Sequence, residues 1–135
     1  MGKRSLWYIL RDRIAFPCED LEEVARQQLD PAAWRVAHTV VAEGACWVST
    51  VFLGLDHSAG QGDPLLFETM AFLQADASEG SVGEPRALRR YSSWVEAEAG
   101  HAEMVKQIEA EYLAAADHVR AGVARAAGAG GVSPG

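Results

Sequence analysis

The chain has 135 residues, 49% of them hydrophobic and 23% charged, and its formal net charge is -7 at pH 7. This length suits one domain with a single core, and the composition is typical of a globular protein and not of a disordered chain. The acidic balance argues against generic binding to nucleic acids, because a long-range negative field repels phosphates.

The sequence shows no segment of the export or membrane type. No stretch approaches the roughly 20 apolar residues of a membrane span, and the N-terminal apolar run is broken at Arg11 and Asp12. The two cysteines, Cys18 and Cys46, follow no metal-binding spacing and are expected to be reduced thiols. We therefore expect a cytoplasmic protein without membrane association.

The first predicted elements are a strand and a short helix. Residues 6–10 form an apolar run with strong strand propensity that ends at Arg11. Its position in a sheet is open, and an edge is one option. Residues 21–29 then place apolar side chains at helical spacing behind an acidic segment, which predicts an amphipathic helix that ends near Asp30.

Three strands are predicted in the middle of the chain. Residues 34–41 alternate in the manner of a strand, and the side chains expected on one side are Trp34, Val36, His38 and Val40. Residues 43–44 supply a turn, and residues 46–55 are apolar on both faces, which predicts a central strand. After a polar, glycine-rich loop, residues 65–73 complete a hairpin with it.

A connection without strand or helix character is expected next. Residues 75–85 are mostly small, acidic or glycine, so we expect an exposed, mobile segment that contributes nothing to the core. The three arginines that follow, Arg86, Arg89 and Arg90, form a local basic patch that is either a solvated loop, which we favour, or a binding site.

The last element is a long helix. Ser93 and Glu96 match the S-x-x-E capping box, which predicts the helix start. One face should pack on the sheet through a stripe formed by Val95, Ala99, Ala102, Val105, Ile108, Tyr112, Val119 and Val123. Residues 1–125 thus form the domain, and residues 126–135 are expected to be a flexible tail.

These elements predict an α+β fold. We expect the order β-α-β-β-β-α, with an antiparallel sheet of three to four strands and a long C-terminal helix packed on one face.

Five polar residues are candidates for a functional site, because carboxylates and imidazoles ligate metals and transfer protons: Asp56, His57, Glu68, Glu98 and His101. The expected hairpin register places Glu68 near Phe52, about 16 Å along the sheet from His57, so one metal ion could not bind both. Asp56, His57 and Asp63 share one loop, where they could form a structured turn or ligate a metal.

Two further features have a structural and a functional interpretation. Gly100 costs about 1 kcal/mol in a helix interior, so it either allows a bulky sheet residue such as Trp47 to approach closely or clears space for a ligand beside His101 and Glu98. A half-buried Glu68 is either one partner of an ion pair with Arg35 or Arg90, or a catalytic acid.

Several segments carry a resemblance. The sequences VSTVFLGLDH at residues 48–57, PLLFETM at 64–70 and AEAGH at 97–101, with a weaker N-terminal part, resemble a family of small uncharacterised proteins encoded by bacteria and their phages. The resemblance covers roughly residues 6–110 and implies no specific activity. The hairpin loop, SAGQG at residues 58–62, and the longer connection after PLLFETM depart from the family pattern.

Sequence and resemblance together predict a non-enzymatic binding or accessory protein of phage or mobile-element type that acts through protein contacts and needs no cofactor. No catalytic motif for a nucleophile, a phosphate loop or a dinucleotide is present in the sequence. The alternative is a metal-dependent hydrolase that uses Asp56 and His57 with His101 and a divalent metal. The long helix could also mediate homo-oligomerisation, because its apolar stripe exceeds what a small sheet can cover.

Overall fold

The structure, a computed structural model, describes residues 5–74 and 84–131, with side chains as far as Gly128. Its elements in chain order are β1 (Tyr8–Arg11), β2 (Ile14–Pro17), α1 (Leu21–Gln28), α2 (Pro31–Trp34), β3 (Arg35–Val41), the 3-10 turn η1 (Ala42–Gly44), β4 (Cys46–Phe52), β5 (Phe67–Leu73), β6 (Ala87–Tyr91) and α3 (Trp94–Gly131). The α+β fold with an antiparallel sheet and a long C-terminal helix is confirmed. The mobile connection expected at residues 75–85 lies largely outside the described residues.

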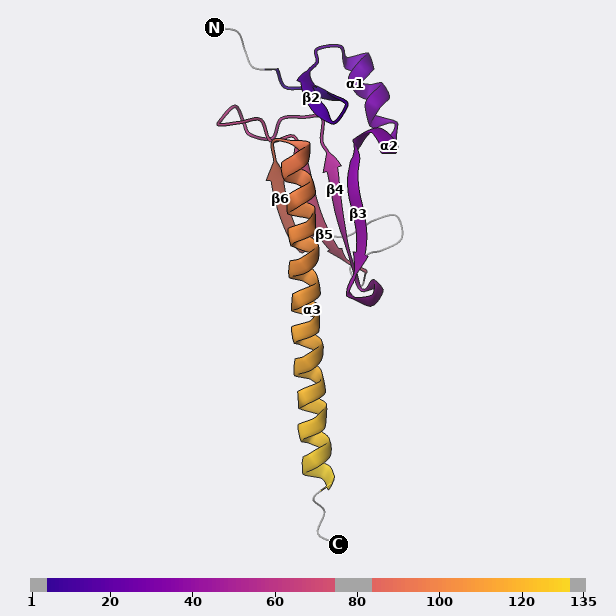
Figure 1. Cartoon of the computed structure of the whole chain (residues 1–135), viewed down its shortest axis with the longest axis vertical. Coiled ribbons are helices and arrows are strands. Elements are labelled where there is room, and N and C mark those ends of the chain that lie inside the picture. Colours follow the sequence, from indigo (N-terminus) through magenta and orange to yellow (C-terminus); the bar gives the residue numbers. More distant parts are fainter. Residues whose placement is uncertain (1–4, 75–83, 132–135) are drawn as a thin grey trace.

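The main sheet has four antiparallel strands in the order β3-β4-β5-β6. β4 lies between β3 and β5, which confirms the predicted central position. The β4–β5 register pairs Val51 with Glu68 and Phe52 with Phe67, within one residue of the expected pairing. Long α3 crosses one face of this sheet (Figure 1).

The N-terminal strand belongs to a second, two-stranded sheet. β1 pairs antiparallel with β2, which the sequence analysis missed. The turn between them holds Asp12 at φ 50° and Arg13 at φ 66°, as the mirror-image turns of tight hairpins require. Such turns usually contain Asn-Gly or Asp-Gly, so an Asp-Arg pair gave no turn signal. A bridge between Trp7 and Leu55 connects the hairpin to the end of the main sheet.

Strand β6 corrects the expectation of a solvated arginine loop. Arg89 and Arg90 lie in this edge strand, paired with Thr69 and Glu68 of β5. Charged side chains are common on edge strands, where they discourage pairing with other chains. The charged residues therefore predicted solvent exposure correctly, but their low strand propensity meant that β6 was not predicted.

A bulge in β3 breaks the predicted alternation. Arg35 pairs with Val51 and Ala37 with Thr50, so Val36 is an extra residue between two neighbouring positions of β4. A bulge moves the residue before it to the other face of the sheet. Arg35, and not Val36, consequently shares a face with His38 and Val40.

Helix α3 begins as predicted but turns a different face to the sheet. Ser93 Oγ accepts a hydrogen bond from the Glu96 amide at 3.2 Å, which confirms the cap. The buried residues of the first turns are Ala97, Gly100, His101 and Met104, whereas Val95 is 78% exposed. The predicted stripe was wrong in these first turns, where Val95, Ala99 and Ala102 are exposed, because Ala97, Gly100 and His101 are small or polar and carry little hydrophobic signal. Farther along, Val105, Ile108 and Tyr112 pack on the core as predicted.

The described part of the chain has three core clusters, and two of them lie between α3 and the main sheet. One surrounds Val48, Ala71 and Met104, and the other surrounds Phe52 and Phe67. Both cysteines are free and buried, and burial raises the pKa of the Cys46 thiol. Within the described part of the chain, no helix is long and apolar enough to cross a membrane.

Helix α3 also extends further than expected. It continues to Gly131, so residues 126–131, which the sequence analysis assigned to the tail, are helical. Alanine has the highest helix propensity, which offsets part of the cost of the glycines there.

Candidate functional site

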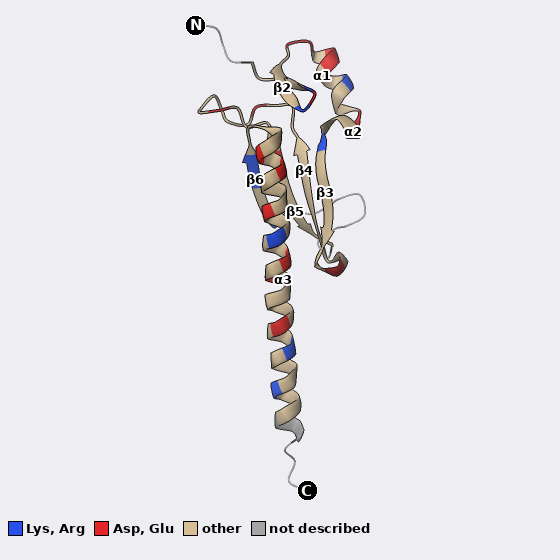
Figure 2. Ribbon diagram, viewed as in Figure 1, with Lys and Arg blue, Asp and Glu red and all other residues tan. Residues whose placement is uncertain are grey.

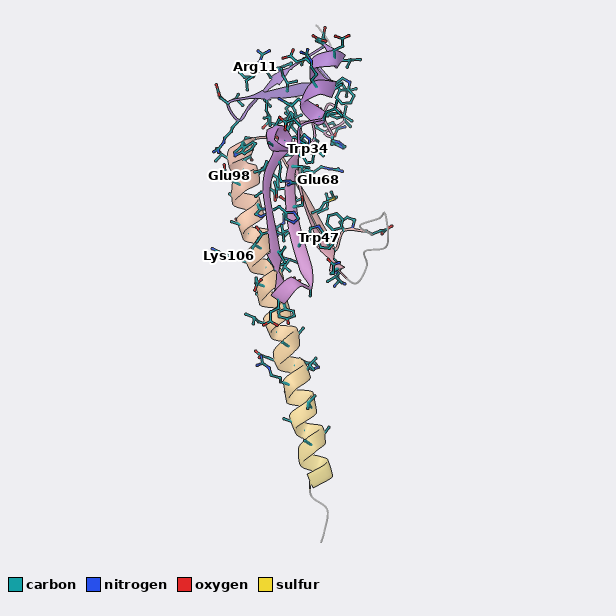
Figure 3. The ribbon with its side chains drawn as sticks, turned by 90° about the vertical axis from the view of Figure 1, so that its right-hand side faces the viewer. Arg11, Trp34, Trp47, Glu68, Glu98 and Lys106 are labelled. Carbon is teal, nitrogen blue, oxygen red and sulfur yellow. The ribbon has the colours of Figure 1, made fainter. Side chains whose placement is uncertain are left out.

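The structure separates the five predicted site residues into four places. Asp56 and His57 lie in the loop after β4, Glu68 lies on β5, and Glu98 and His101 lie on different faces of α3. In Figure 3, Glu68 lies on the side of the sheet away from α3, whereas Glu98 lies on α3 itself. No common cleft is formed by these residues.

Asp56 organises the loop that follows β4. Its Oδ1 accepts hydrogen bonds from the amides of Ser58 at 2.8 Å and Leu65 at 3.0 Å, so it fastens both ends of the loop. Gly60 and Gly62 have φ values of 79° and 69°, which a glycine adopts without strain. The structured-turn interpretation is confirmed for Asp56, while the His57 side chain is exposed.

Glu68 is the buried member of an ion pair. Its Oε2 accepts a hydrogen bond from Nε of Arg90 at 2.8 Å, and its side chain is 8% exposed against 36% for Arg90. The register places the two residues directly opposite each other on β5 and β6. A buried carboxylate needs a paired partner, so the ion-pair interpretation holds with Arg90 as that partner.

Glu98 connects α3 to the N-terminal hairpin. Its Oε1 accepts a hydrogen bond from Nε1 of Trp94 and lies 3.7 Å from the guanidinium of Arg13. That guanidinium also lies over the Trp94 ring, 5.2 Å from its centroid. Glu98 therefore has a structural role at the hairpin turn.

His101 is at the centre of a buried polar network. Its Nδ1 lies 2.7 Å from Oγ1 of Thr50, its Nε2 lies 2.8 Å from Oγ1 of Thr39, and Thr50 Oγ1 lies 2.5 Å from Oγ1 of Thr69. A neutral imidazole donates through one nitrogen and accepts through the other, so both nitrogens are satisfied. Burial, and secondarily the nearby His38, lowers the pKa of His101, which favours this neutral form.

The threonines of this network were not identified from the sequence. Thr39, Thr50 and Thr69 lie on three neighbouring strands, and Thr50 and Thr69 are fully buried. Threonine is common in strands for its shape alone, so a single threonine gives no signal. The network becomes visible only when register and helix position are known.

Tyr91 fills the space beside Gly100. A methyl group added to Gly100 would overlap the hydroxyl oxygen, Cζ and Cε1 of the Tyr91 ring. The bulky residue that approaches the helix is therefore Tyr91 of β6 and not Trp47, and no ligand space exists there. The Tyr91 hydroxyl is buried and has no hydrogen-bond partner among the described residues.

A metal site is not formed by these residues. Across residues 5–74 and 84–131, no three or more His, Cys, Asp or Glu side chains group closely enough to hold a metal ion. Asp56 is used by the loop amides, and His101 is enclosed by threonines. The proposed hydrolase site of Asp56, His57 and His101 therefore lacks its geometric basis.

The sheet surface opposite α3 differs from these buried networks. We call it the open face, and the register gives it three cross-strand rows: Arg35, Val51, Glu68 and Arg90; His38, Ser49, Met70 and Leu88; Val40, Trp47 and Phe72. Figure 3 shows Trp47 on this side.

The open face is apolar at the end away from the ion pair. The Trp47 and Phe72 rings stack with centroids 5.3 Å apart, and Val40 and Leu88 are 62% and 45% exposed. An antiparallel sheet with one covered face usually carries polar side chains on the other. This surface departs from that pattern.

Comparisons of the chain with protein-family models, with curated proteins and with solved structures found no match. The resemblance to small bacterial and phage proteins stays a prediction.

Proposed function

We propose that the chain is a small binding or accessory protein of phage or mobile-element type that acts through protein contacts made by its open face. The observation that carries this proposal is the exposed apolar surface of Val40, Trp47 and Leu88 on the side of the sheet that α3 leaves uncovered, where the buried Phe72 stacks against the Trp47 ring. Large exposed apolar side chains gathered on one face are typical of interaction sites.

The residues of the first row indicate the chemistry of the partner. Arg90 is paired with Glu68, whereas no described carboxylate forms an ion pair with Arg35. Arg35 instead lies over the Trp34 ring, 5.8 Å from its centroid. The open face thus combines an apolar end with one surplus positive charge in a protein whose formal net charge is -7.

An amphipathic helix of another protein fits this arrangement. Its apolar stripe would cover Trp47 and Leu88, and an acidic residue at one end would reach Arg35. The sheet offers room for such a helix, because four strands about 4.8 Å apart are wider than a helix of about 10 Å. This would be the counterpart of the way α3 covers the opposite face.

The test compares two positions for a photo-crosslinking amino acid in the full chain. Val40 lies on the open face, and Val95, which is 78% exposed on α3, serves as the matched control. We expect the probe at position 40 to crosslink to one defined protein, and the probe at position 95 not to crosslink to that protein. The helix of the captured protein, made as a peptide, should then bind the purified chain.

Substitutions provide the second arm of the test. Val40→Lys with Leu88→Lys should abolish binding of the peptide, Arg35→Ser should weaken it and reduce its salt dependence, and Val95→Lys should leave it unchanged. Equal binding by the Val40→Lys/Leu88→Lys variant would overturn the proposal. A crosslink from Val40 to a second copy of the chain would replace the helix partner with a sheet-to-sheet dimer.

A further inference from the structure

Half of helix α3 extends beyond the rest of the fold. The helix has 38 residues, which corresponds to roughly 57 Å, whereas the seven-residue strands span roughly 23 Å. Among the described residues, its last hydrogen bond to another element joins the Tyr112 hydroxyl to Glu43 Oε2 at 3.0 Å. One hollow between α3 and the sheet ends at Ala115, and a second, beside Glu43, reaches Val119 and Arg120. Figure 1 shows α3 continuing alone below the sheet. We call residues 113–131 the overhang.

The stripe that packs α3 on the sheet continues into the overhang. Met104, Ile108 and Tyr112 pack on the core, and at the same three- and four-residue spacing the helix then presents Ala115, Ala116, Val119, Gly122, Val123 and Ala126. Val119 and Val123 are 62% and 64% exposed. A solvated helix needs no such stripe, so this one marks a contact surface.

The overhang has little tertiary packing of its own to stabilise it. Most helical stability in proteins comes from packing of an apolar face, and Gly122 adds a cost of about 1 kcal/mol relative to alanine. A partner helix would supply that packing. The small side chains at Ala115, Ala116 and Gly122 allow a second helix to approach closely. The larger side chains of Val119 and Val123 would then pack over the small residues of the second helix.

Charges beside the stripe indicate what that second helix is. Glu111 precedes the overhang, and Arg125 follows 14 positions later on the same flank, with His118 midway between them. Figure 2 shows acidic and basic positions alternating along α3, with basic positions nearest its C-terminal end. Two copies in parallel would bring Glu111 next to Glu111 and Arg125 next to Arg125. Two antiparallel copies would bring Glu111 next to Arg125 twice.

We propose that two copies of the chain form a dimer through their overhangs, antiparallel about a two-fold axis close to His118. In this arrangement Val119 of one copy packs opposite Ala116 of the other, and Tyr112 packs opposite Val123. Each contact occurs twice, as a self-complementary interface requires. The two sheets lie at opposite ends of the dimer, and both open faces stay accessible.

The interface is small. The paired stretch from Tyr112 to Ala126 is roughly 22 Å long, and its side chains are mostly alanine and valine. Its buried area falls at or below the roughly 1,200 Å² that separates stable from transient interfaces. We therefore expect dissociation constants in the micromolar range, on the order of 1 to 100 μM.

Sedimentation equilibrium of the full chain from about 5 to 500 μM tests this directly. The wild type should shift from monomer to dimer across the series, and Val119→Glu should stay monomeric at every concentration. Ala121→Glu is the matched control: it adds the same charge one half-turn away, on the exposed side of the same helix, and should dimerise as the wild type does. Circular dichroism should show that the wild type and both variants are folded.

Charge reversal tests the antiparallel orientation. Glu111→Arg and Arg125→Glu should each weaken the dimer at least severalfold, and the double variant should restore it. A wild type that stays monomeric at 500 μM, or a dimer that survives Val119→Glu, would overturn the proposal. Loss of the dimer in Val40→Lys/Leu88→Lys, with no effect of Val119→Glu, would assign dimerisation to the open face instead.

Discussion

The phenol ring of Tyr91 occupies the space that a side chain at position 100 would need, so Gly100 of α3 and Tyr91 of β6 fit only as a pair. The contact is possible because α3 lies directly over the edge strand, where Tyr91 points toward the helix beside Phe67. It explains a glycine in the middle of a helix without any ligand.

Gly100→Ala should therefore destabilise the protein, although alanine is the better helix former. Overlap with Tyr91 forces the helix or the ring to move, at a cost of about 1 to 3 kcal/mol or more. Gly128→Ala is the control, because no atom lies within 4 Å of a methyl group added there. It should leave the stability unchanged or raise it by up to about 1 kcal/mol. Urea unfolding measures both, and equal stability of the two variants would contradict this account.

The unpartnered hydroxyl of Tyr91 gives a related prediction. Tyr91→Phe removes a buried polar group that makes no hydrogen bond with the described residues. The free energy of unfolding should therefore rise, or fall by less than about 1 kcal/mol. Tyr91→Phe should not rescue Gly100→Ala, since Cζ and Cε1 still overlap the added methyl group. Tyr91→Ala in combination with Gly100→Ala should show a favourable coupling in a double-mutant cycle.

Thr50 should be the most sensitive polar residue of the core. Thr50→Val keeps the shape but leaves both His101 Nδ1 and the Thr69 hydroxyl without a partner, which should cost about 1 to 3 kcal/mol. Ser49→Ala, one residue away on the open face, should change stability by less than about 0.5 kcal/mol. Thermal unfolding of the two variants measures the difference, and a Thr50→Val protein as stable as Ser49→Ala would show that the network contributes little.

His101 should make stability depend on pH. Because its folded pKa is lowered relative to the unfolded value near 6.5, the unfolded chain binds the proton more readily. The contribution of His101 to the free energy of unfolding is complete at pH values above the unfolded pKa. It is lost, at up to about 1.4 kcal/mol per pH unit, as the pH falls from the unfolded pKa toward the folded pKa. Unfolding midpoints from pH 8 to 5.5 should decline for the wild type and less for His101→Gln. Identical slopes would exclude His101 as the cause.

The two arginine pairs of β6 should differ in strength. Arg90 pairs with a carboxylate that is 8% exposed, whereas Arg89 contacts Glu103 at 3.3 Å with both side chains in water. Arg90→Gln leaves Glu68 buried and unpaired, so it should destabilise clearly more than Arg89→Gln, which should cost less than about 1 kcal/mol. Urea unfolding at low and high salt compares them, and a larger loss for Arg89→Gln would reverse this ranking.

Much of the fold could be predicted from local sequence. The periodicity of residues 46–55, the cap at Ser93 and the acidic start of α1 each depend on neighbours within a few positions, and the structure confirms these elements. β2 and β6 were missed because their signals were an unusual Asp-Arg turn and a short charged edge strand. The strand pairing expected for Glu68 was also correct to within one residue, since a hairpin fixes it locally.

The sequence by itself determined the strands β1, β3, β4 and β5 and the helices α1 and α3, because these follow from propensity and spacing along the chain. Only the tertiary structure decided which side of α3 faces the sheet, that His101 meets Thr39 and Thr50, and that Tyr91 accounts for Gly100. His101 is separated from those threonines by 62 and 51 positions, so their contact depends on strand register and helix rotation together. Such contacts arise from packing the whole chain at once and leave no periodic trace in the sequence.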